Sequence, residues 1–273
     1  MSDDEQAMTT EPNKEAAELE AGYTAGHRAY EIGGMLLTTS GCIWLCVRLA
    51  KCQPLSGWWV PLAAFIGILL ADFCSGLFHW AFDTWGNLDT PVFGRLAIRT
   101  FRHHHVDQKA MLKHDFIETN GHNIALASLW TYGGLYSFTP ETASLGDVFF
   151  GMVCVSATIF VSITSQIHKW AHMDVAPPFI RLLQRTYVIL SPEHHSAHHV
   201  APYSRNYCIT VGWLNGPLRF IRFFETLERI ISALTGAIPR EDDLGKKAAE
   251  AAREEEENAE ATGILAESHH RDG

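Results

Sequence analysis

The sequence predicts an all-α, polytopic membrane protein with about four transmembrane helices and a histidine-rich cap on one side of the membrane. Three observations lead to this prediction. The chain of 273 residues is 47% hydrophobic and only 19% charged. Its apolar residues are gathered in blocks rather than spread evenly. Its 15 histidines lie mostly in the polar segments that follow two of these blocks.

Four apolar stretches are long enough to be membrane helices, because about 20 residues rising 1.5 Å each cross a hydrocarbon core of about 30 Å. They are approximately Ile32–Ala50, Trp58–Leu77, Ile124–Phe138 and Val148–Ile167. The third stretch is short and interrupted by glycines. Trp58 and Trp59 open the second stretch, as aromatic residues do at a membrane interface.

The arrangement of the spans predicts the side of the membrane on which the histidines lie. With four spans, the polar segments that begin at His79 and His168 share a side with the N-terminus. The first of these segments contains Arg95, Arg99, Arg102, Lys109 and Lys113. The connections on the other side, Lys51–Ser56 and Thr139–Asp147, contain one lysine. Since basic loops tend to stay in the cytosol, we expect the histidines and both termini to be cytosolic.

The ends of the chain differ from its middle. Residues 1–30 and 244–273 are acidic, and the tails hold most of the formal charge of −10, so we expect disordered tails around a membrane domain over residues 31–243. The acidic start lacks the pattern of a secretory signal, so the first span is expected to direct insertion. The nearly neutral middle has no basic patch, and nucleic-acid binding is therefore not indicated.

Two shorter amphipathic segments, Pro177–Leu190 and Leu214–Leu234, follow the last span. In the second segment, apolar residues recur every three or four positions, which is typical of a helix. A helix that lies on the membrane or caps the histidine-bearing face fits this pattern, and so does an ordinary helix facing the protein core.

Histidines form four clusters. These are HWAFD, with His79 and Asp83; HHH, with His103, His104 and His105, followed by His114; HKWAH, with His168 and His172; and HHSAHH, with His194, His195, His198 and His199. A spacing of three or four residues places two side chains on one helix face. Neutral imidazole binds Fe, Zn or Cu, and a mixed set of histidine and carboxylate is common for non-haem iron. The clusters therefore predict a metal site.

The number of clustered histidines favours two metal ions. Eleven histidines exceed what a single zinc ion with three or four protein ligands can use. The chain lacks the HExxH motif of zinc proteases, and zinc cannot change its oxidation state, so iron acting with O2 on a lipid chain is the stronger prediction. The sequence shows neither a haem motif nor a Gly-rich flavin or nicotinamide fold, so a separate electron donor is expected.

Some residues and functions stay open at this point. His103, His122 and Asn120 lie within the second histidine segment without a clear role, whereas His27, His269 and His270 lie outside the clusters. A non-catalytic metal-binding or adaptor protein is the alternative from a different functional class.

Several strings resemble the Kua family of lipid desaturases. They are ADFCSGLFHWAFDTWG, HDFIETNG, QIHKW and VILSPEHHSAHH, followed by CITVGWLN. The resemblance extends from about Gly33 to Asp243. It implies an O2-dependent 1,2-dehydrogenation of the alkyl ether chain of a 1-O-alkyl-2-acyl-glycerophosphoethanolamine, which gives the vinyl ether of a plasmalogen. It also implies a di-iron centre in the endoplasmic reticulum membrane, with electrons from NADH through cytochrome b5 reductase and cytochrome b5.

The resemblance also implies a set of ligands. The family's pattern falls on His79, Asp83, His104, His105, His114, His168, His172, His194, His195, His198 and His199. The family usually has an acidic residue at the position of His103 and an aspartate at that of His122, so neither is counted as a ligand by analogy. A desaturase of phospholipid acyl chains and a membrane lipid hydroxylase remain alternatives, because ligands report the reaction rather than the substrate.

Overall fold

The computed structural model describes residues 23–52, 57–87, 89–91, 93–94, 98–200 and 202–241. The C-terminal tail expected over residues 244–273, which contains His269 and His270, lies outside the described residues, as does the N-terminal tail up to residue 22. All regular elements in the described part of the chain are helical, which confirms the predicted all-α class.

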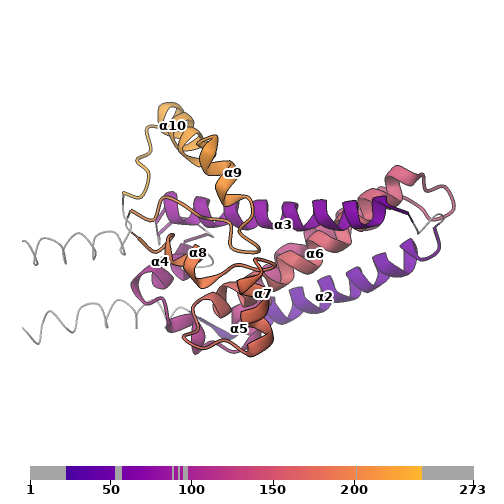
Figure 1. The fold of residues 1–273 in the computed structure, drawn as a ribbon, viewed down its shortest axis with the longest axis horizontal. Coiled ribbons are helices and arrows are strands. Elements are labelled where there is room, and N and C mark those ends of the chain that lie inside the picture. Colours follow the sequence, from indigo (N-terminus) through magenta and orange to yellow (C-terminus); the bar gives the residue numbers. More distant parts are fainter. Residues whose placement is uncertain are drawn as a thin grey trace, which may run out of the picture.

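Four long helices form the body of the molecule (Figure 1). They are α2 (Ala25–Leu49), α3 (Trp59–Thr84), α5 (Phe116–Ser137) and α6 (Leu145–Ala171). By length and composition, α2, α3 and α6 are suited to cross a membrane. Helix α5 is also long, at 22 residues, but its first turns carry polar side chains. The predicted count of about four spans is thus approximate, with three clear candidates and α5 packed beside them.

Two helices begin earlier than their apolar stretches because polar side chains cap them. The Thr24 side chain accepts a hydrogen bond from the backbone N–H of His27, so α2 starts at Ala25 rather than near Ile32. Asp115 accepts from the backbone N–H groups at the start of α5 at 2.9 and 3.0 Å. The third predicted span is therefore extended by a polar first turn that leads toward the histidines.

Small residues allow the long helices to approach closely. Helix α5 packs between α2 and α6, and α3 packs on α6. A Cβ atom added to Gly67 of α3 would lie 2.5 Å from the Cβ atom of Ser156 on α6. One added to Gly34 of α2 would lie 2.4 Å from the Cβ atom of Ala125 on α5. Close contacts of this kind are typical of helices that associate within a membrane.

One end of the bundle gathers the histidine-bearing segments. The start of α2, the end of α3, the start of α5 and the end of α6 meet there, together with α4 (Arg99–Val106) and α8 (Pro192–Ser196) (Figure 1). The short helix η2 (Ala110–Leu112) follows α4, and α7 (Pro178–Arg185) follows α6. The two polar segments therefore lie at the same end of the fold, as the arrangement of spans predicts.

The amphipathic C-terminal segment forms two helices rather than one. Helix α9 (Asn215–Phe220) and helix α10 (Phe223–Thr235) are separated at Arg222, whose φ of 53° is incompatible with a continuous right-handed helix. On one side, α10 packs against the end of α3, where Phe224 stacks near Trp80 with ring centroids 5.5 Å apart. On the other side it leaves apolar residues exposed, including Leu234 at 80%.

Candidate metal centre

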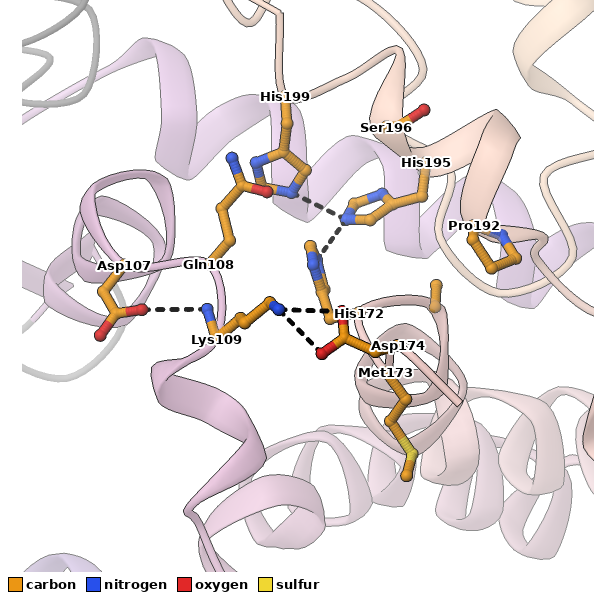
Figure 2. A pocket seen from close by; sticks show the side chains of 11 residues that line it. Asp107, Gln108, Lys109, His172, Met173, Asp174, Pro192, His195, Ser196 and His199 are labelled. Carbon is orange, nitrogen blue, oxygen red and sulfur yellow. Dashed lines mark hydrogen bonds and ion pairs between the residues drawn. The ribbon is translucent and has the colours of Figure 1, made fainter. Parts of the chain in front are cut away.

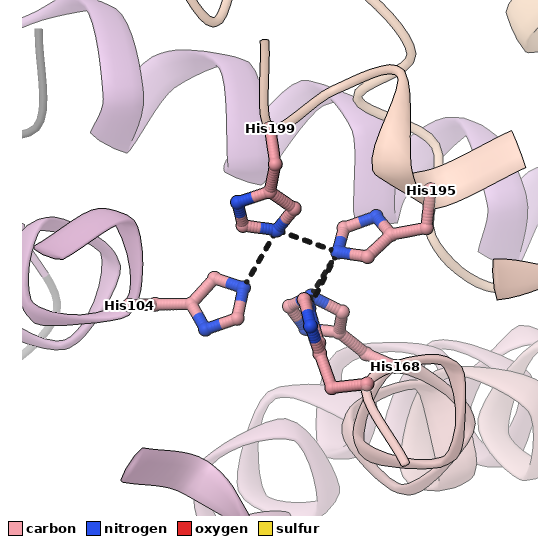
Figure 3. Close-up of side chains that lie close together, drawn as sticks. His104, His168, His195 and His199 are labelled. Atoms are coloured by element: carbon pink, nitrogen blue, oxygen red, sulfur yellow. Dashed lines mark hydrogen bonds between the residues drawn. The ribbon is translucent and has the colours of Figure 1, made fainter. Parts of the chain in front are cut away.

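Five imidazoles converge between the end of α6 and the segments that cover it. They come from His104 on α4, His168 and His172 at the end of α6, and His195 and His199 in and after α8. Their Nε2 atoms face one another (Figure 3). The Nε2 atom of His195 lies 2.7 Å from that of His172, 2.8 Å from that of His168 and 2.9 Å from that of His199. We call these residues the five-histidine group.

A second group of four residues lies beside the first. It contains His79 and Asp83 on α3, His105 on α4 and His198, all of them buried. The Asp83 carboxylate lies 3.2 Å from Nε2 of His79, 3.4 Å from Nε2 of His198 and 3.5 Å from Nε2 of His105. We call it the carboxylate group. The predicted pairing of His79 with Asp83 on one helix face is thus present.

Neighbouring histidines contribute to different groups. His104 belongs to the five-histidine group and His105 to the carboxylate group, and the same division separates His199 from His198. Successive side chains on a helix diverge, so one short segment can supply a ligand to each of two adjacent centres. The structure thereby suggests an assignment of histidines to two centres that the sequence left open.

The chemical state of these rings fits a bound cation. Burial lowers the pKa of His172 to about 4, so its imidazole is neutral near pH 7. The pKa of His199 falls to about 2, first through burial and then through the neighbouring histidines. Neutral imidazoles present lone pairs, and several lone pairs pointing at one place are favourable only around a positive charge. The donor sets, five nitrogens in one group and three nitrogens with a carboxylate in the other, suit iron.

Backbone carbonyls orient two rings of the carboxylate group. The Nδ1 atom of His79 lies 3.1 Å from the Tyr207 carbonyl oxygen, and Nδ1 of His198 lies 2.9 Å from that of Arg205. A proton held on Nδ1 by such a carbonyl leaves the Nε2 lone pair free for a metal. The loop over residues 205–215 therefore sets the direction in which these two imidazoles point.

Asp72 of α3 holds this loop in place and was missed by the sequence reasoning. The fully buried carboxylate accepts hydrogen bonds from the backbone N–H groups of Val211, Gly212 and Leu214 at 2.9, 2.8 and 3.0 Å. Asn215 then bonds to the backbone of Cys208 through both its side-chain atoms. The available signal was an aspartate inside an apolar span, a placement that usually marks a function.

Two of the eleven predicted ligands lie outside both groups. The Nε2 atom of His114 is 3.6 Å from a carboxylate oxygen of Glu118, and that of His194 is 3.1 Å from the side-chain amide nitrogen of Asn215. The assignment of the eleven residues as ligands stays a prediction, and the structure brings nine of them together.

The structure also describes the side chains of two of the three residues whose role the sequence leaves open. His122 has its ring centroid 5.9 Å from that of Tyr30, whereas the side chain of His103 lies outside the described residues. The amide of Asn120 donates to Gln166, and its Oδ1 atom is buried without a hydrogen-bond partner. Neither His122 nor Asn120 is a member of either group.

An elongated cavity of about 380 Å³, which we call the apolar cavity, reaches the five-histidine group from one side. Its lining comes from α2, α3, α4, α5 and α6 and includes His104 and His168. Its apolar part includes Ala71, Leu77, Phe78, Leu126, Leu129, Trp130 and Val161. Along α5 it is lined from Glu118 to Trp130, a length of about 18 Å at 1.5 Å per residue.

A second cavity of about 570 Å³, which we call the polar cavity, reaches the same group from another side (Figure 2). It is lined by His172, His195 and His199 together with Lys109 and Asp174. The Lys109 ammonium forms an ion pair with Asp174 at 2.8 Å, and both side chains are exposed. This cavity therefore gives water access to these three imidazoles.

Comparison with known proteins relates the chain to membrane lipid enzymes. It matches the lipid desaturase domain over residues 68–242. It is 44% identical over 239 residues to plasmanylethanolamine desaturase of Myxococcus xanthus, covering 87% of this chain and 84% of that one. It is 41% identical over 236 residues to plasmanylethanolamine desaturase 1 of Mus musculus, covering 84% and 86%. It is 36% identical over 214 residues to chloroplastic fatty acid desaturase 4 of Arabidopsis thaliana, covering 75% and 63%. No solved structure matches the chain.

Proposed function

Because this chain belongs to the lipid desaturase family, we propose that it converts the 1-O-alkyl chain of plasmanylethanolamine to the vinyl ether of plasmenylethanolamine. The chain is an oxidoreductase of the desaturase type. In the proposed reaction, the two alkyl carbons next to the ether oxygen lose two hydrogens. Together with O2, two external electrons and two protons, these hydrogens yield two waters. The high identity to two relatives with this named activity supports the ether lipid over an acyl chain.

One observation carries the proposal: the lining of the apolar cavity includes His104 and His168 of the five-histidine group. Its lining over much of its length is aliphatic or aromatic, which suits a hydrocarbon chain. A lipid whose alkyl chain occupied this cavity would bring its first carbons to the candidate metal ligands. Access from between α3 and α5 would let the lipid enter without leaving the bilayer.

The two groups would hold two iron ions. The five-histidine group would hold one and the carboxylate group the other, with His114 and His194 as the remaining predicted ligands outside these groups. Bound iron supplies the O2 chemistry needed to remove hydrogen from an unactivated C–H bond. The protein's own part is to keep the imidazoles neutral, to aim their Nε2 atoms, and to shield the alkyl chain from water.

Electrons would arrive from NADH through cytochrome b5 reductase and cytochrome b5 at the polar cavity. That cavity opens onto three members of the five-histidine group and has charged residues at its mouth, as an approach for a soluble redox domain requires. The proposed setting is the endoplasmic reticulum membrane, with the histidine-bearing end and both termini in the cytosol.

The proposal is tested by expressing the full chain in cells that lack vinyl ether lipids and contain plasmanylethanolamine. Mass spectrometry of extracted lipids is expected to show plasmenylethanolamine with the wild type and none with His195→Ala at equal protein level. A wild type that instead introduces a double bond into an acyl chain, or a hydroxyl group into the alkyl chain, would overturn the proposal.

A further inference from the structure

The polar end of the apolar cavity contains two acidic side chains. Glu31 of α2 and Glu118 of α5 both line it, close to the histidine-bearing end of the bundle. Glu31 is only 5% exposed, and the side chain of Glu118 is 24% exposed. Two carboxylates that share a largely enclosed space repel one another and lose hydration, so they call for a positive charge between them.

The packing of α2 on α5 fixes these carboxylates near each other. A Cβ atom added to Gly121 would lie 2.5 Å from the Cβ atom of Glu31, so only glycine leaves room for Glu31 against α5 at this point. Gly121 is three residues after Glu118, on the same face of α5. Arg28 also ties the two helix starts together through an ion pair of 2.6 Å with Asp115.

Neither carboxylate forms an ion pair with a lysine or arginine of the described part of the chain. Arg28 is the basic residue of α2 that is closest in sequence to Glu31, and it forms an ion pair with Asp115. Glu31 accepts a hydrogen bond of 2.6 Å from the neutral hydroxyl of Tyr23, and Glu118 has His114 at 3.6 Å. Neither carboxylate has a lysine or arginine within 4.0 Å among the described residues. Arg28 acts on Glu31 and Arg99 acts on Glu118 only at longer range, so neither carboxylate has a direct cationic partner among the described residues.

The same end of the cavity also offers groups suited to an anion. Arg99 of α4 lines it, and burial lowers the pKa of its guanidinium whereas the charge of Glu118 raises it. The Nε2 atom of His27, which lines the cavity as well, is buried and has no hydrogen-bond partner. Carboxylates and a guanidinium in one cavity are complementary to a zwitterion.

We propose that Glu118 and Glu31 bind the primary ammonium of an ethanolamine head group, with Arg99 facing its phosphate. This inference rests on the proposed function. The bond to be desaturated is next to the ether oxygen, so only glycerol and phosphate separate it from the ammonium. A head-group site must therefore adjoin the candidate metal ligands, and this cavity contains both. A primary ammonium donates hydrogen bonds to carboxylates, whereas the trimethylammonium of choline has no N–H to donate.

The test compares matched substrates in membranes that contain the full-length protein. Vinyl ether formation is measured at varied concentrations of plasmanylethanolamine and of plasmanylcholine with the same alkyl chain. Glu118→Gln and Glu31→Gln are each expected to raise the KM for plasmanylethanolamine by about tenfold, as expected for loss of one charged hydrogen bond. Their KM for plasmanylcholine is expected to rise clearly less, because the trimethylammonium loses only charge attraction and no hydrogen bond, and their iron content per chain is expected to stay unchanged.

Glu225→Gln serves as the control, because Glu225 is an exposed carboxylate on α10, remote from the cavity lining, and pairs with Arg222. It is expected to keep the wild-type preference for ethanolamine. Unchanged head-group preference in both cavity variants, while the wild type makes vinyl ether, would overturn this inference alone. A wild type that makes no vinyl ether from either lipid would overturn the proposed function and this inference with it.

Discussion

The two cavities that reach the five-histidine group differ in their walls and in what they admit. The apolar cavity is lined by residues of five helices and combines a hydrocarbon wall, which includes Leu126, Leu129 and Trp130, with polar side chains near the histidines. The polar cavity is larger and bounded by charged residues, with an ion pair at its mouth. They touch different members of the group: His104 and His168 line the first, whereas His172, His195 and His199 line the second. Under the proposed function, the first cavity would admit the lipid and the second would admit water-borne reactants to the same histidines.

The largest loss of turnover is expected from a substitution within the five-histidine group, which both cavities reach. His195→Ala removes the imidazole whose Nε2 atom lies within 2.7 to 2.9 Å of three others. We expect at least about a 100-fold loss of vinyl ether formation and a loss of about one metal ion per chain, because an open ligand position weakens binding. Turnover and metal content by mass spectrometry check this.

His194→Ala is the matched control, since it removes the adjacent imidazole, which contacts Asn215 outside both groups. It is expected to retain both metal ions. An equal loss of metal in the two variants would show that His194 is a ligand and that the geometric division is incomplete.

A smaller loss of turnover is expected from a substitution that fills part of the apolar cavity and leaves the polar cavity unchanged. Leu126→Trp adds bulk to its wall on α5 and is expected to lower turnover about tenfold, since overpacking costs about 1–3 kcal/mol. Metal content is expected to stay unchanged, and a substrate with a shorter alkyl chain is expected to be less affected. Leu36→Trp, on the exposed face of α2, makes the same change outside the cavity. Equal turnover in the two variants would exclude the apolar cavity as the lipid route.

The smallest effect is expected at the mouth of the polar cavity. Lys109→Ala breaks an ion pair whose side chains are 62% and 78% exposed. Exposed pairs contribute about 0–1 kcal/mol, so turnover is expected to change by less than about threefold. Assays at low and high salt measure the effect. A loss as large as that of His195→Ala would mean that this ion pair is essential for turnover and would contradict the minor role expected for an exposed pair.

Much of the fold could be predicted from the sequence, because long apolar blocks have few alternatives to membrane helices. The placement of the histidine segments at one end followed from the order of these blocks. The start of α2 was missed since it depends on one hydrogen bond, from the His27 backbone to Thr24, rather than on hydropathy. The division between α9 and α10 was missed because it depends on the backbone angle at Arg222.

The candidate site was predictable as a set of residue types and only partly as a geometry. Clusters at helical spacing indicated the convergence of histidines. The separation of His104 from His105 depends on how α4 is turned against α6, which no local pattern encodes. Asp72 acts on a loop about 140 residues later in the chain, and Glu31 lies against Gly121, three residues after Glu118, only when α2 packs on α5. Long-range contacts of this kind become visible only in the folded chain.

The alternation of neighbouring histidines between the two groups restricts which sequence changes the histidine-bearing end can accept during evolution. Each of the pairs His104–His105 and His198–His199 contributes one imidazole to the five-histidine group and one to the carboxylate group. Insertion or deletion of a single residue just before a pair would shift the pair by one position. Each imidazole would then point away from its own group, so both groups would lose a member at once. Residues around the two groups can be substituted singly, but insertions and deletions within these two stretches are not tolerated.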